Sequence, residues 1–163
     1  MTKTVALIQA RMSSSRFPGK VLKTLGGLPL IVYMARRAAQ ARHVDEVIVV
    51  TSTDVSDDPL AEALQQASVP IFRGALADVL QRYAEAAQAC SAETIVRLTG
   101  DCPLIDPDVI DAVITTRVHT SADYASNIDP PTFPDGLDVE CFTREALERA
   151  QRQATRGPER EHV

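Results

Sequence analysis

The chain of 163 residues contains no tryptophan, and only 4% of its residues are aromatic. Proteins that hold single-stranded nucleic acid stack the bases on aromatic side chains, so this composition argues against that class. A basic excess is missing as well, because 22 acidic residues outnumber 17 basic ones and leave a net charge of −5. General binding to nucleic acid or to anionic membranes needs a basic surface. We therefore expect neither as a partner.

Long hydrophobic runs and paired cysteines are also missing. No run of about 18 apolar residues occurs, so we expect no membrane span. The first residues lack the apolar region and cleavage site of a secretory signal, which predicts a cytoplasmic protein. The cysteines, Cys90, Cys102 and Cys141, are odd in number and far apart, which predicts free thiols. The length predicts one domain over residues 1–163.

Short β-branched runs alternate with amphipathic segments over residues 1–120. The runs at 4–8, 46–51, 69–72 and 93–98 are continuously apolar, as parallel strands covered on both faces should be. Helical patterns begin at Pro29, at Asp58-Pro59, near Leu76 and at Asp106-Pro107, where Asp106 is expected to cap the helix. This alternation predicts an α/β fold with a mostly parallel sheet flanked by helices.

The rhythm changes after residue 120. Residues 123–127 and 137–142 are typical of strands, separated by a turn-rich segment, and residues 144–153 of a helix. Residues 156–163 resemble the opening of another helix. We therefore divide the domain into a core over 1–120 and a second part over 121–163, which we expect to be incomplete.

The segment after the first predicted strand is rich in cations and small hydroxyl residues. Its sequence is Gln9-Ala10-Arg11-Met12-Ser13-Ser14-Ser15-Arg16-Phe17-Pro18-Gly19-Lys20. Ligands of open α/β sheets bind beyond the carboxyl ends of the strands, which is where this segment lies. Side-chain and backbone donors there can converge on a polyphosphate. A solvated surface loop is the alternative interpretation.

A carboxylate follows the fourth predicted strand in the same way. Asp101 comes directly after Gly100, at the end of the 93–98 run. Mg²⁺ prefers one or two carboxylates together with phosphate oxygens and water. Asp101 is therefore the candidate metal ligand, with an ordinary turn aspartate as the alternative.

The two segments together resemble a known family. Arg-x-x-Ser-x-Arg-x-Pro-Gly-Lys and Gly-Asp-x-Pro-Leu-Ile are similar to the signatures of cytidylyltransferases that activate sugar acids, such as the KDO and acylneuraminate enzymes and the spore coat polysaccharide biosynthesis protein F group. The resemblance implies a Rossmann-like nucleotide-diphospho-sugar transferase fold of the GT-A type. It also implies nucleotidyl transfer from an NTP, with CTP expected, to a sugar or sugar acid, with Mg²⁺ as cofactor and pyrophosphate as product.

The resemblance assigns roles to single residues. Arg11, Lys20 and Asp101 would be catalytic, with Asp101 holding the metal, and Arg11, Ser14, Arg16 and Lys20 would bind the triphosphate. Around the nucleobase it implies Arg73, Asp78 and Arg82; an Asp78–Arg82 pair at a helix start is the equal alternative. The Pro-x-Gly-x-Asp-x-Glu element implies that Asp135, Asp138 and Glu140 bind the acceptor sugar, with an exposed hairpin as the alternative.

The resemblance further implies a homodimer with residues 124–163 at the interface. Two other functions stay open at this point. The first is a glycosyltransferase of the same fold that uses an NDP-sugar; it would be expected to carry an Asp-x-Asp motif and no basic loop after the first strand. The second is a non-catalytic nucleotide-binding or dimerisation module.

Overall fold

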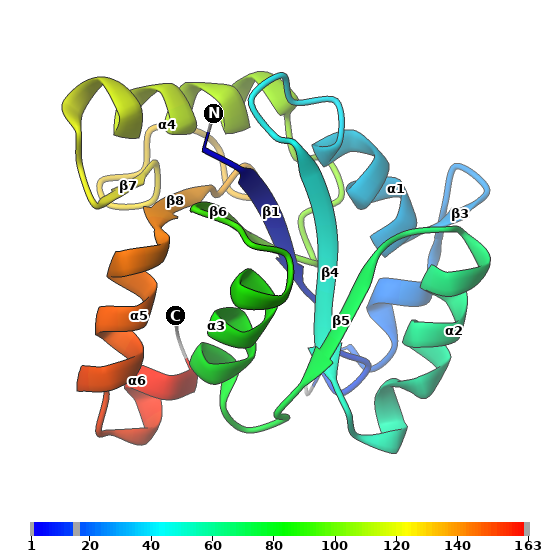
Figure 1. Cartoon of the computed structure of the whole chain (residues 1–163). Coiled ribbons are helices and arrows are strands. Elements are labelled where there is room, and N and C mark those ends of the chain that lie inside the picture. The colour runs from blue at the N-terminus through cyan, green and yellow to red at the C-terminus, as the bar shows by residue number, and fades with distance from the viewer. Residues whose placement is uncertain (1, 15–16, 162–163) are drawn as a thin grey trace.

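A computed structural model describes residues 2–14 and 17–161 of the chain. In these residues a six-stranded sheet forms in the order β5-β4-β1-β6-β8-β7 (Figure 1). Its strands are β1 (Thr4–Gln9), β4 (Glu46–Ser52), β5 (Ile71–Gly74), β6 (Thr94–Thr99), β7 (Tyr124–Ser126) and β8 (Glu140–Thr143). The pairs from β5 to β6 are parallel, whereas β8 is antiparallel to both β6 and β7. The prediction of an α/β fold with a mostly parallel sheet is confirmed.

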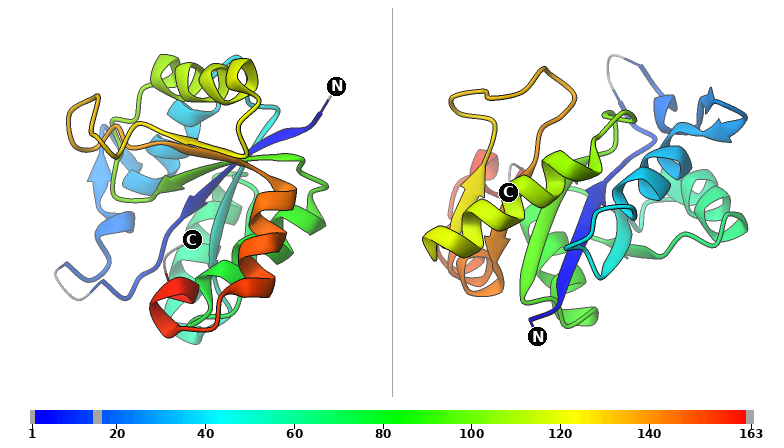
Figure 2. Two further views of the ribbon diagram at one scale, coloured as in Figure 1. Left: turned by 90° about the vertical axis from the view of Figure 1, so that its left-hand side faces the viewer. Right: turned by 90° about the horizontal axis from the view of Figure 1, so that it is seen from above.

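Helices cover both faces of this sheet. They are α1 (Leu30–Ala38), α2 (Asp58–Gln66), α3 (Val79–Ala89), α4 (Pro107–Thr120), α5 (Arg144–Gln153) and α6 (Gly157–Glu161). Alternate residues of β1 explain the layers: Ala6 and Ile8 join an apolar cluster with residues of α1, α2 and α4. Val5 and Leu7 join a second cluster with residues of α3 and α5. Figure 2 shows α4 on one side of the sheet and α5 and α6 on the other.

Short elements complete the chain, and several bounds differ from the prediction. The hairpin of β2 (Thr24–Leu25) and β3 (Leu28–Pro29), and the 3-10 turns η1 (Lys20–Leu22) and η2 (Val55–Asp57), were not predicted. Helix α3 begins at Val79 rather than near Leu76, because the Asp78 carboxylate accepts a hydrogen bond from the Gln81 amide and caps the helix there. Asp106 caps α4 as predicted, by accepting from the Asp108 amide at 2.8 Å.

Strand β8 is shorter than the predicted strand over 137–142. Gly136 adopts a left-handed φ of 92°, which keeps the preceding segment in a turn. The Asn127 side chain then takes the place of a strand partner, because it donates to the Leu137 carbonyl and accepts from the Val139 amide, both at 2.8 Å. Residues 137–139 are therefore an ordered loop, and β8 begins at Glu140.

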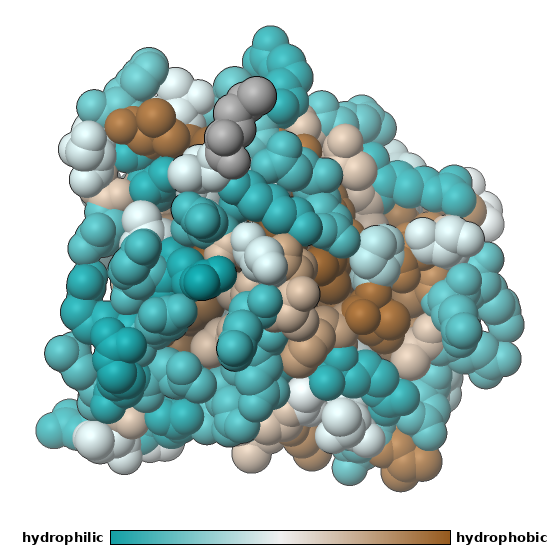
Figure 3. Space-filling view, in the orientation of Figure 1, coloured by the Kyte–Doolittle hydropathy of each residue, from teal (hydrophilic) through white to brown (hydrophobic). Residues whose placement is uncertain are grey.

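Figure 3 shows the face of the molecule that Figure 1 presents to the viewer. This face is mostly hydrophilic, and apolar residues gather on it over the region of α3, β4 and β5. Within the described residues, no helix combines the length and the apolar composition that crossing a bilayer requires. The three cysteines are free thiols, with Cys141 buried and Cys90 and Cys102 half-buried.

Candidate active site

The loop after β1 reaches the carboxyl edge of the sheet at the point where the strand order reverses. The chain runs from β1 to β4 and β5 on one side and later returns to β6 on the other. Open α/β sheets bind ligands at such a switch point. Within the loop, the Met12 carbonyl accepts from the Ser14 and Gly19 amides at 3.0 and 2.9 Å. Gly19, with a left-handed φ of 70°, then turns the chain so that η1 begins with Lys20.

Asp101 lies opposite this loop at the end of β6. The Lys20 Nζ atom donates to Asp101 Oδ2 at 2.8 Å. Partial burial alone would raise the pKa of Asp101, but the hydrogen bond and the charge of Lys20 outweigh it and hold the pKa below its ordinary value. Asp101 is therefore ionised at neutral pH, as a carboxylate ligand for Mg²⁺ has to be, and it forms an ion pair with Lys20.

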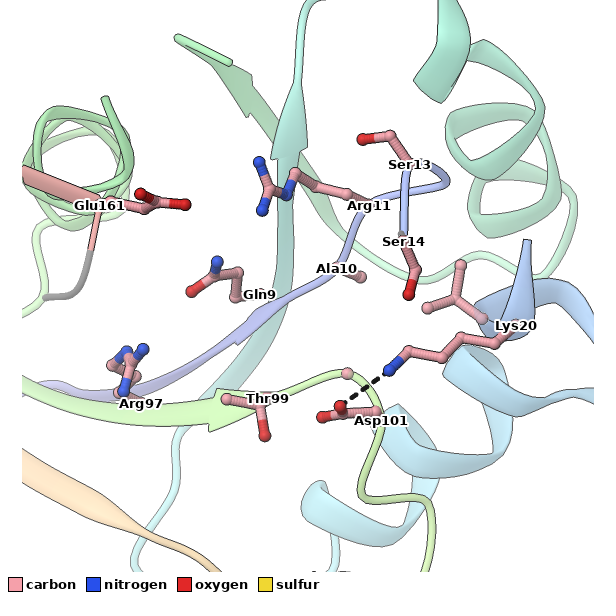
Figure 4. Close-up of a pocket in the computed structure, with 12 residues that line it drawn as sticks. Gln9, Ala10, Arg11, Ser13, Ser14, Lys20, Arg97, Thr99, Asp101 and Glu161 are labelled. Carbon is pink, nitrogen blue, oxygen red and sulfur yellow. Dashed lines mark hydrogen bonds and ion pairs between the residues drawn. The ribbon is translucent and has the colours of Figure 1, made fainter. Parts of the chain in front are cut away.

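A cavity of about 600 Å³ opens between the loop and the end of β6. Figure 4 shows Arg11, Ser13 and Ser14 on the loop side of this cavity and Thr99 and Asp101 on the β6 side. The full lining is Gln9, Ala10, Arg11, Ser13, Ser14, Lys20, Val21, Arg97, Thr99, Gly100, Asp101 and Glu161. Cations, hydroxyl groups and the carboxylates of Asp101 and Glu161 thus surround a space large enough for a nucleotide.

Asp101 also borders a second, acidic cavity of about 410 Å³. The other residues that line this cavity are Thr99, Cys102, Asp135, Gly136 and Asp138. Burial, followed by the negative charges of Asp135, Glu140 and Asp101, raises the pKa of Asp138 above its ordinary value. The site therefore has a cationic side and an acidic side, with Asp101 between them.

The residues present fit Mg²⁺ in one coordination mode. The described residues contain no group of three or more His, Cys, Asp or Glu side chains that could enclose a metal ion. An all-protein cage is therefore not formed by these ranges. Mg²⁺ commonly uses one or two carboxylates and completes its shell with phosphate oxygens and water, and Asp101 fits that pattern. Metal binding at Asp101 stays a prediction.

The predicted triphosphate residues come together, with one outside the described ranges. Arg11, Ser14 and Lys20 all line the cationic cavity. Arg16 lies outside the described residues, so its prediction is untouched by the structure. These side chains come from one loop, because the chain reverses between β1 and η1.

The predicted nucleobase residues lie outside that lining. Arg73 donates to the Ser52 carbonyl at 2.8 Å and to the Asp58 carboxylate at 2.6 Å. Arg82 is fully buried and donates to the Ala75 carbonyl at 2.7 Å.

Asp78 does not form the alternative pair with Arg82. Its carboxylate accepts from Arg160 Nε at 2.6 Å instead. The roles of Arg73, Asp78 and Arg82 toward a nucleobase stay predictions.

The three residues predicted to bind the acceptor lie in two different environments. Asp135 and Asp138 line the acidic cavity. Glu140 is buried, forms an ion pair with Arg97 and accepts from the Tyr124 hydroxyl at 2.8 Å. Glu140 thus holds Arg97 in place, and a direct contact with the acceptor stays a prediction.

Sequence reasoning missed residues of the cationic cavity. Gln9 and Arg97 lie on neighbouring strands that pair residue by residue, Gln9 with Thr99 and Leu7 with Arg97. The Gln9 Oε1 and Arg97 Nε atoms are buried without a hydrogen-bond partner among the described residues. Both are polar side chains at the carboxyl ends of apolar strands, and that signal could have identified them.

Glu161 enters the cavity from the far end of the chain, with its carboxylate on the side toward Arg11 in Figure 4. The Arg160–Asp78 ion pair fixes α6 against the start of α3, next to Glu161. No local sequence signal indicates such a contact between residues 82 positions apart.

Gly100 is required by the close approach of β1. A Cβ atom at this position would meet the Gln9 carbonyl oxygen at 2.8 Å and the Ala10 Cβ at 3.0 Å. Because the first of these atoms is backbone and the second is a Cβ fixed to it, Gly100→Ala is expected to push β6 away from β1 and to lower the free energy of unfolding by about 1–3 kcal/mol. Urea denaturation measures this change. Gly157→Ala, whose Cβ would meet nothing within 4 Å and whose φ is not left-handed, is the control for the loss of a glycine without a clash. An equal loss in both variants would contradict the steric explanation.

Comparison with known proteins identifies the family. A family model described as cytidylyltransferase matches residues 5–161. An uncharacterized protein of Methanocaldococcus jannaschii is 35% identical over 161 residues, which cover 99% of this chain and 65% of the relative. Spore coat polysaccharide biosynthesis protein SpsF of Bacillus subtilis is 34% identical over 80% of this chain and 56% of its own length. A 3-deoxy-manno-octulosonate cytidylyltransferase of Anaeromyxobacter sp. strain K is 44% identical over 70% of this chain and 47% of its own length.

Solved structures agree with this assignment. A cytidylyltransferase from Leptospira borgpetersenii matches with a TM-score of 0.94 and 35% identity, covering 99% of this chain and 69% of that one. A CMP:2-keto-3-deoxy-manno-octonic acid synthetase complexed with CTP matches with a TM-score of 0.77 over 97% of this chain and 81% of that one, and at 22% identity it supports the fold alone. The chain spans between 47% and 65% of the length of the three relatives above. With the family model covering nearly all of its residues, the chain belongs to the cytidylyltransferase family.

Proposed function

We propose that this domain transfers a nucleoside monophosphate from CTP to a sugar acid, with release of pyrophosphate. The observation that carries the proposal is the position of Asp101. It lies 2.8 Å from Lys20 on the cationic side and borders the acidic cavity on the other. Membership of the family, and relatives named as cytidylyltransferases of a sugar acid and as a polysaccharide biosynthesis protein, support the same reaction.

The cationic side suits the triphosphate. Arg11 and Lys20 supply positive charge, and Ser14 supplies a hydroxyl donor, around one cavity. When the chain has bound the nucleotide, these groups would hold the β- and γ-phosphates and stabilise the charge that develops on the departing pyrophosphate. Mg²⁺ at Asp101 would supply neutralisation of charge on the phosphate oxygens.

The acidic side suits the hydroxyl groups of an acceptor. Asp135 and Asp138 offer carboxylate oxygens that accept hydrogen bonds from such hydroxyls. An acceptor hydroxyl held there would attack the α-phosphorus: its proton passes to solvent, the new O–P bond forms and the bond to pyrophosphate breaks. Positioning and charge stabilisation account for this chemistry, so no covalent protein nucleophile is needed.

A pyrophosphate-release screen tests the proposal directly. Nucleoside triphosphates are combined with sugar acids and Mg²⁺, and release from CTP with one sugar acid is the expected result. Release of a nucleoside diphosphate from an NDP-sugar would instead support glycosyl transfer. Binding of CTP without turnover of any sugar acid would support a nucleotide-binding module.

The family resemblance also leads us to propose a cytoplasmic homodimer. Tyr124 on the edge strand β7 is half exposed and stacks on Phe142 with ring centroids 6.3 Å apart. A half-exposed aromatic side chain on the last strand of the described sheet can support contact between subunits. Light scattering after size-exclusion chromatography measures the mass; a monomer at micromolar concentration would contradict this part of the proposal.

Asp138→Asn is expected to make the fold more stable and to weaken binding of the acceptor. Because folding raises the pKa of Asp138, its ionisation opposes folding as the pH rises through the raised pKa. The neutral amide removes that repulsion, so the melting temperature at pH 7 should rise by about 1–2 °C. At pH 3, where the carboxyl group is protonated in both states, the gain should vanish.

The same substitution should raise the KM for the acceptor, because an anionic hydrogen-bond acceptor is lost. Thermal melts at both pH values and initial rates at varied acceptor concentration measure the two effects. A lower melting temperature at pH 7 would show that the Asp138 charge is stabilising, contrary to this explanation.

A further inference from the structure

Asp57 is a fully buried carboxylate beside the candidate active site, and the mechanism above does not use it. It ends η2 and precedes α2. Its Oδ2 atom accepts from the Thr51 hydroxyl at 2.9 Å, from the Ser52 amide at 3.1 Å and from the Ser52 hydroxyl. Its Oδ1 atom accepts from the Met12 amide at 2.7 Å. One carboxylate therefore joins the end of β4 to the loop after β1.

Met12 occupies a central position in that loop. Its carbonyl accepts from the Ser14 and Gly19 amides, so two hydrogen bonds within the loop meet at the same residue whose amide donates to Asp57. The residues on either side, Arg11 and Ser13, both line the cationic cavity. A shift of the Met12 backbone would consequently move these cavity residues together.

The charge of Asp57 is retained in the interior. Burial alone would raise its pKa, but the hydrogen bonds from Ser52, Met12 and Thr51 outweigh burial and lower the pKa below the ordinary value. Burial lowers the pKa of the Arg82 guanidinium below its ordinary value; the charge of Arg11 adds to this effect and the charge of Asp57 opposes it. The Asp57 carboxylate is therefore one of the groups that offset the repulsion between Arg82 and Arg11.

We propose that Asp57 is a positioning residue that fixes residues 11–14 of the loop after β1 in the geometry that binds the triphosphate. It acts through the Met12 backbone and touches no substrate. The proposal rests on the proposed function, because it assigns that loop to phosphate binding. A displacement of about 1 Å at such a site is enough to weaken catalysis by on the order of 100-fold.

The chain contains a matched control for a purely structural carboxylate. Asp111 on α4 is 4% exposed and accepts from the Arg42 and His43 amides at 3.0 and 2.9 Å and from Arg42 Nε at 3.1 Å. Burial opposes its ionisation too, and hydrogen bonds lower its pKa below the ordinary value. Asp111 thus ties a loop to a helix by the same chemistry, but its loop precedes β4 and lies at the amino edge of the sheet, away from the cavity.

The experiment compares Asp57→Asn with Asp111→Asn. In each variant an amide NH₂ group replaces an accepting oxygen, so both should lower the melting temperature. Isothermal titration calorimetry with CTP and Mg²⁺ should then give affinity lower by on the order of ten-fold for Asp57→Asn and within two-fold of wild type for Asp111→Asn. Equal affinities in the two variants would overturn the proposal.

Hydrogen–deuterium exchange provides a readout that is independent of nucleotide binding. The Met12 amide should exchange faster in Asp57→Asn and at the wild-type rate in Asp111→Asn. If the wild-type chain binds no CTP, the proposed function fails, whereas unchanged exchange at Met12 in Asp57→Asn overturns the positioning role itself.

Thr51→Val is a milder variant, in case Asp57→Asn does not fold. It removes one donor to Oδ2 and leaves the Met12 contact intact. A two- to three-fold loss of CTP affinity with faster exchange at Met12 is expected, since the carboxylate is then less firmly held. Wild-type values for both measurements would overturn the proposal.

Discussion

Replacement of Asp101 by asparagine is expected to abolish Mg²⁺-dependent pyrophosphate release, with kcat reduced by on the order of 100- to 1000-fold. Asparagine keeps the shape of the side chain but removes the charge that lies 2.8 Å from Lys20 and borders both cavities. A neutral amide is a poor ligand for Mg²⁺, which prefers carboxylates. Stopped-time assays of pyrophosphate at saturating CTP and acceptor measure the loss.

Asp106→Asn is the control for this experiment. Asp106 is close in sequence to Asp101, but its carboxylate caps α4 and lies outside the lining of both cavities. Asparagine is also a good N-cap residue, so both stability and rate should stay near wild type. If Asp101→Asn retained more than a tenth of the wild-type kcat, Asp101 would have to be removed from the catalytic residues.

Lys20→Ala is expected to weaken CTP binding by about 10- to 100-fold, because a hydrogen bond to a charged group contributes roughly 1.5–3 kcal/mol. Lys20 extends from the start of η1 into the cavity that Arg11 and Ser14 also line. Its removal also takes away the hydrogen bond and the charge that oppose the effect of burial, so the pKa of Asp101 should rise. Calorimetric titration with CTP measures the affinity.

The matched control is Lys3→Ala. Lys3 forms an ion pair with Glu46 at 2.8 Å, the same separation as Lys20 and Asp101, but at the opposite end of the sheet. Exposed pairs contribute about 0–1 kcal/mol to stability, so both variants should fold. Equal CTP affinity in Lys20→Ala and Lys3→Ala would remove Lys20 from the phosphate site.

The fold could be predicted where local patterns are strong. The apolar runs at 4–8, 46–51 and 93–98 lie within a residue of the observed β1, β4 and β6, because buried parallel strands need continuous apolar sequence. Prediction was weaker for β8, since the Asn127 side chain replaces strand pairing over 137–139. A contact between a side chain and a distant backbone leaves no periodic signal in the sequence.

The same distinction between local patterns and distant contacts applies to the residues of the candidate site. Arg11, Ser14 and Lys20 belong to the segment after β1, and Asp101 follows β6, so the topology brings the two segments together. Asp57 and Glu161 reach the site through contacts across the fold, and neither carries a motif. Their positions depend on packing between elements, which a single sequence does not reveal.

Strand β8 runs antiparallel to β6, so the cationic and acidic sides of the site come from segments that are far apart in the sequence. Arg97 pairs with Glu140, the first residue of β8, so the carboxyl edge of β6 meets the beginning of β8. The acidic residues Asp135 and Asp138 therefore belong to the connection that enters β8, whereas the cationic loop leaves β1. Connections vary more freely than strands do. Substitutions confined to residues 128–138 should thus change which acceptor is used and leave the affinity for CTP unaltered. New sugar specificities can then evolve without changes to the residues of the cationic cavity.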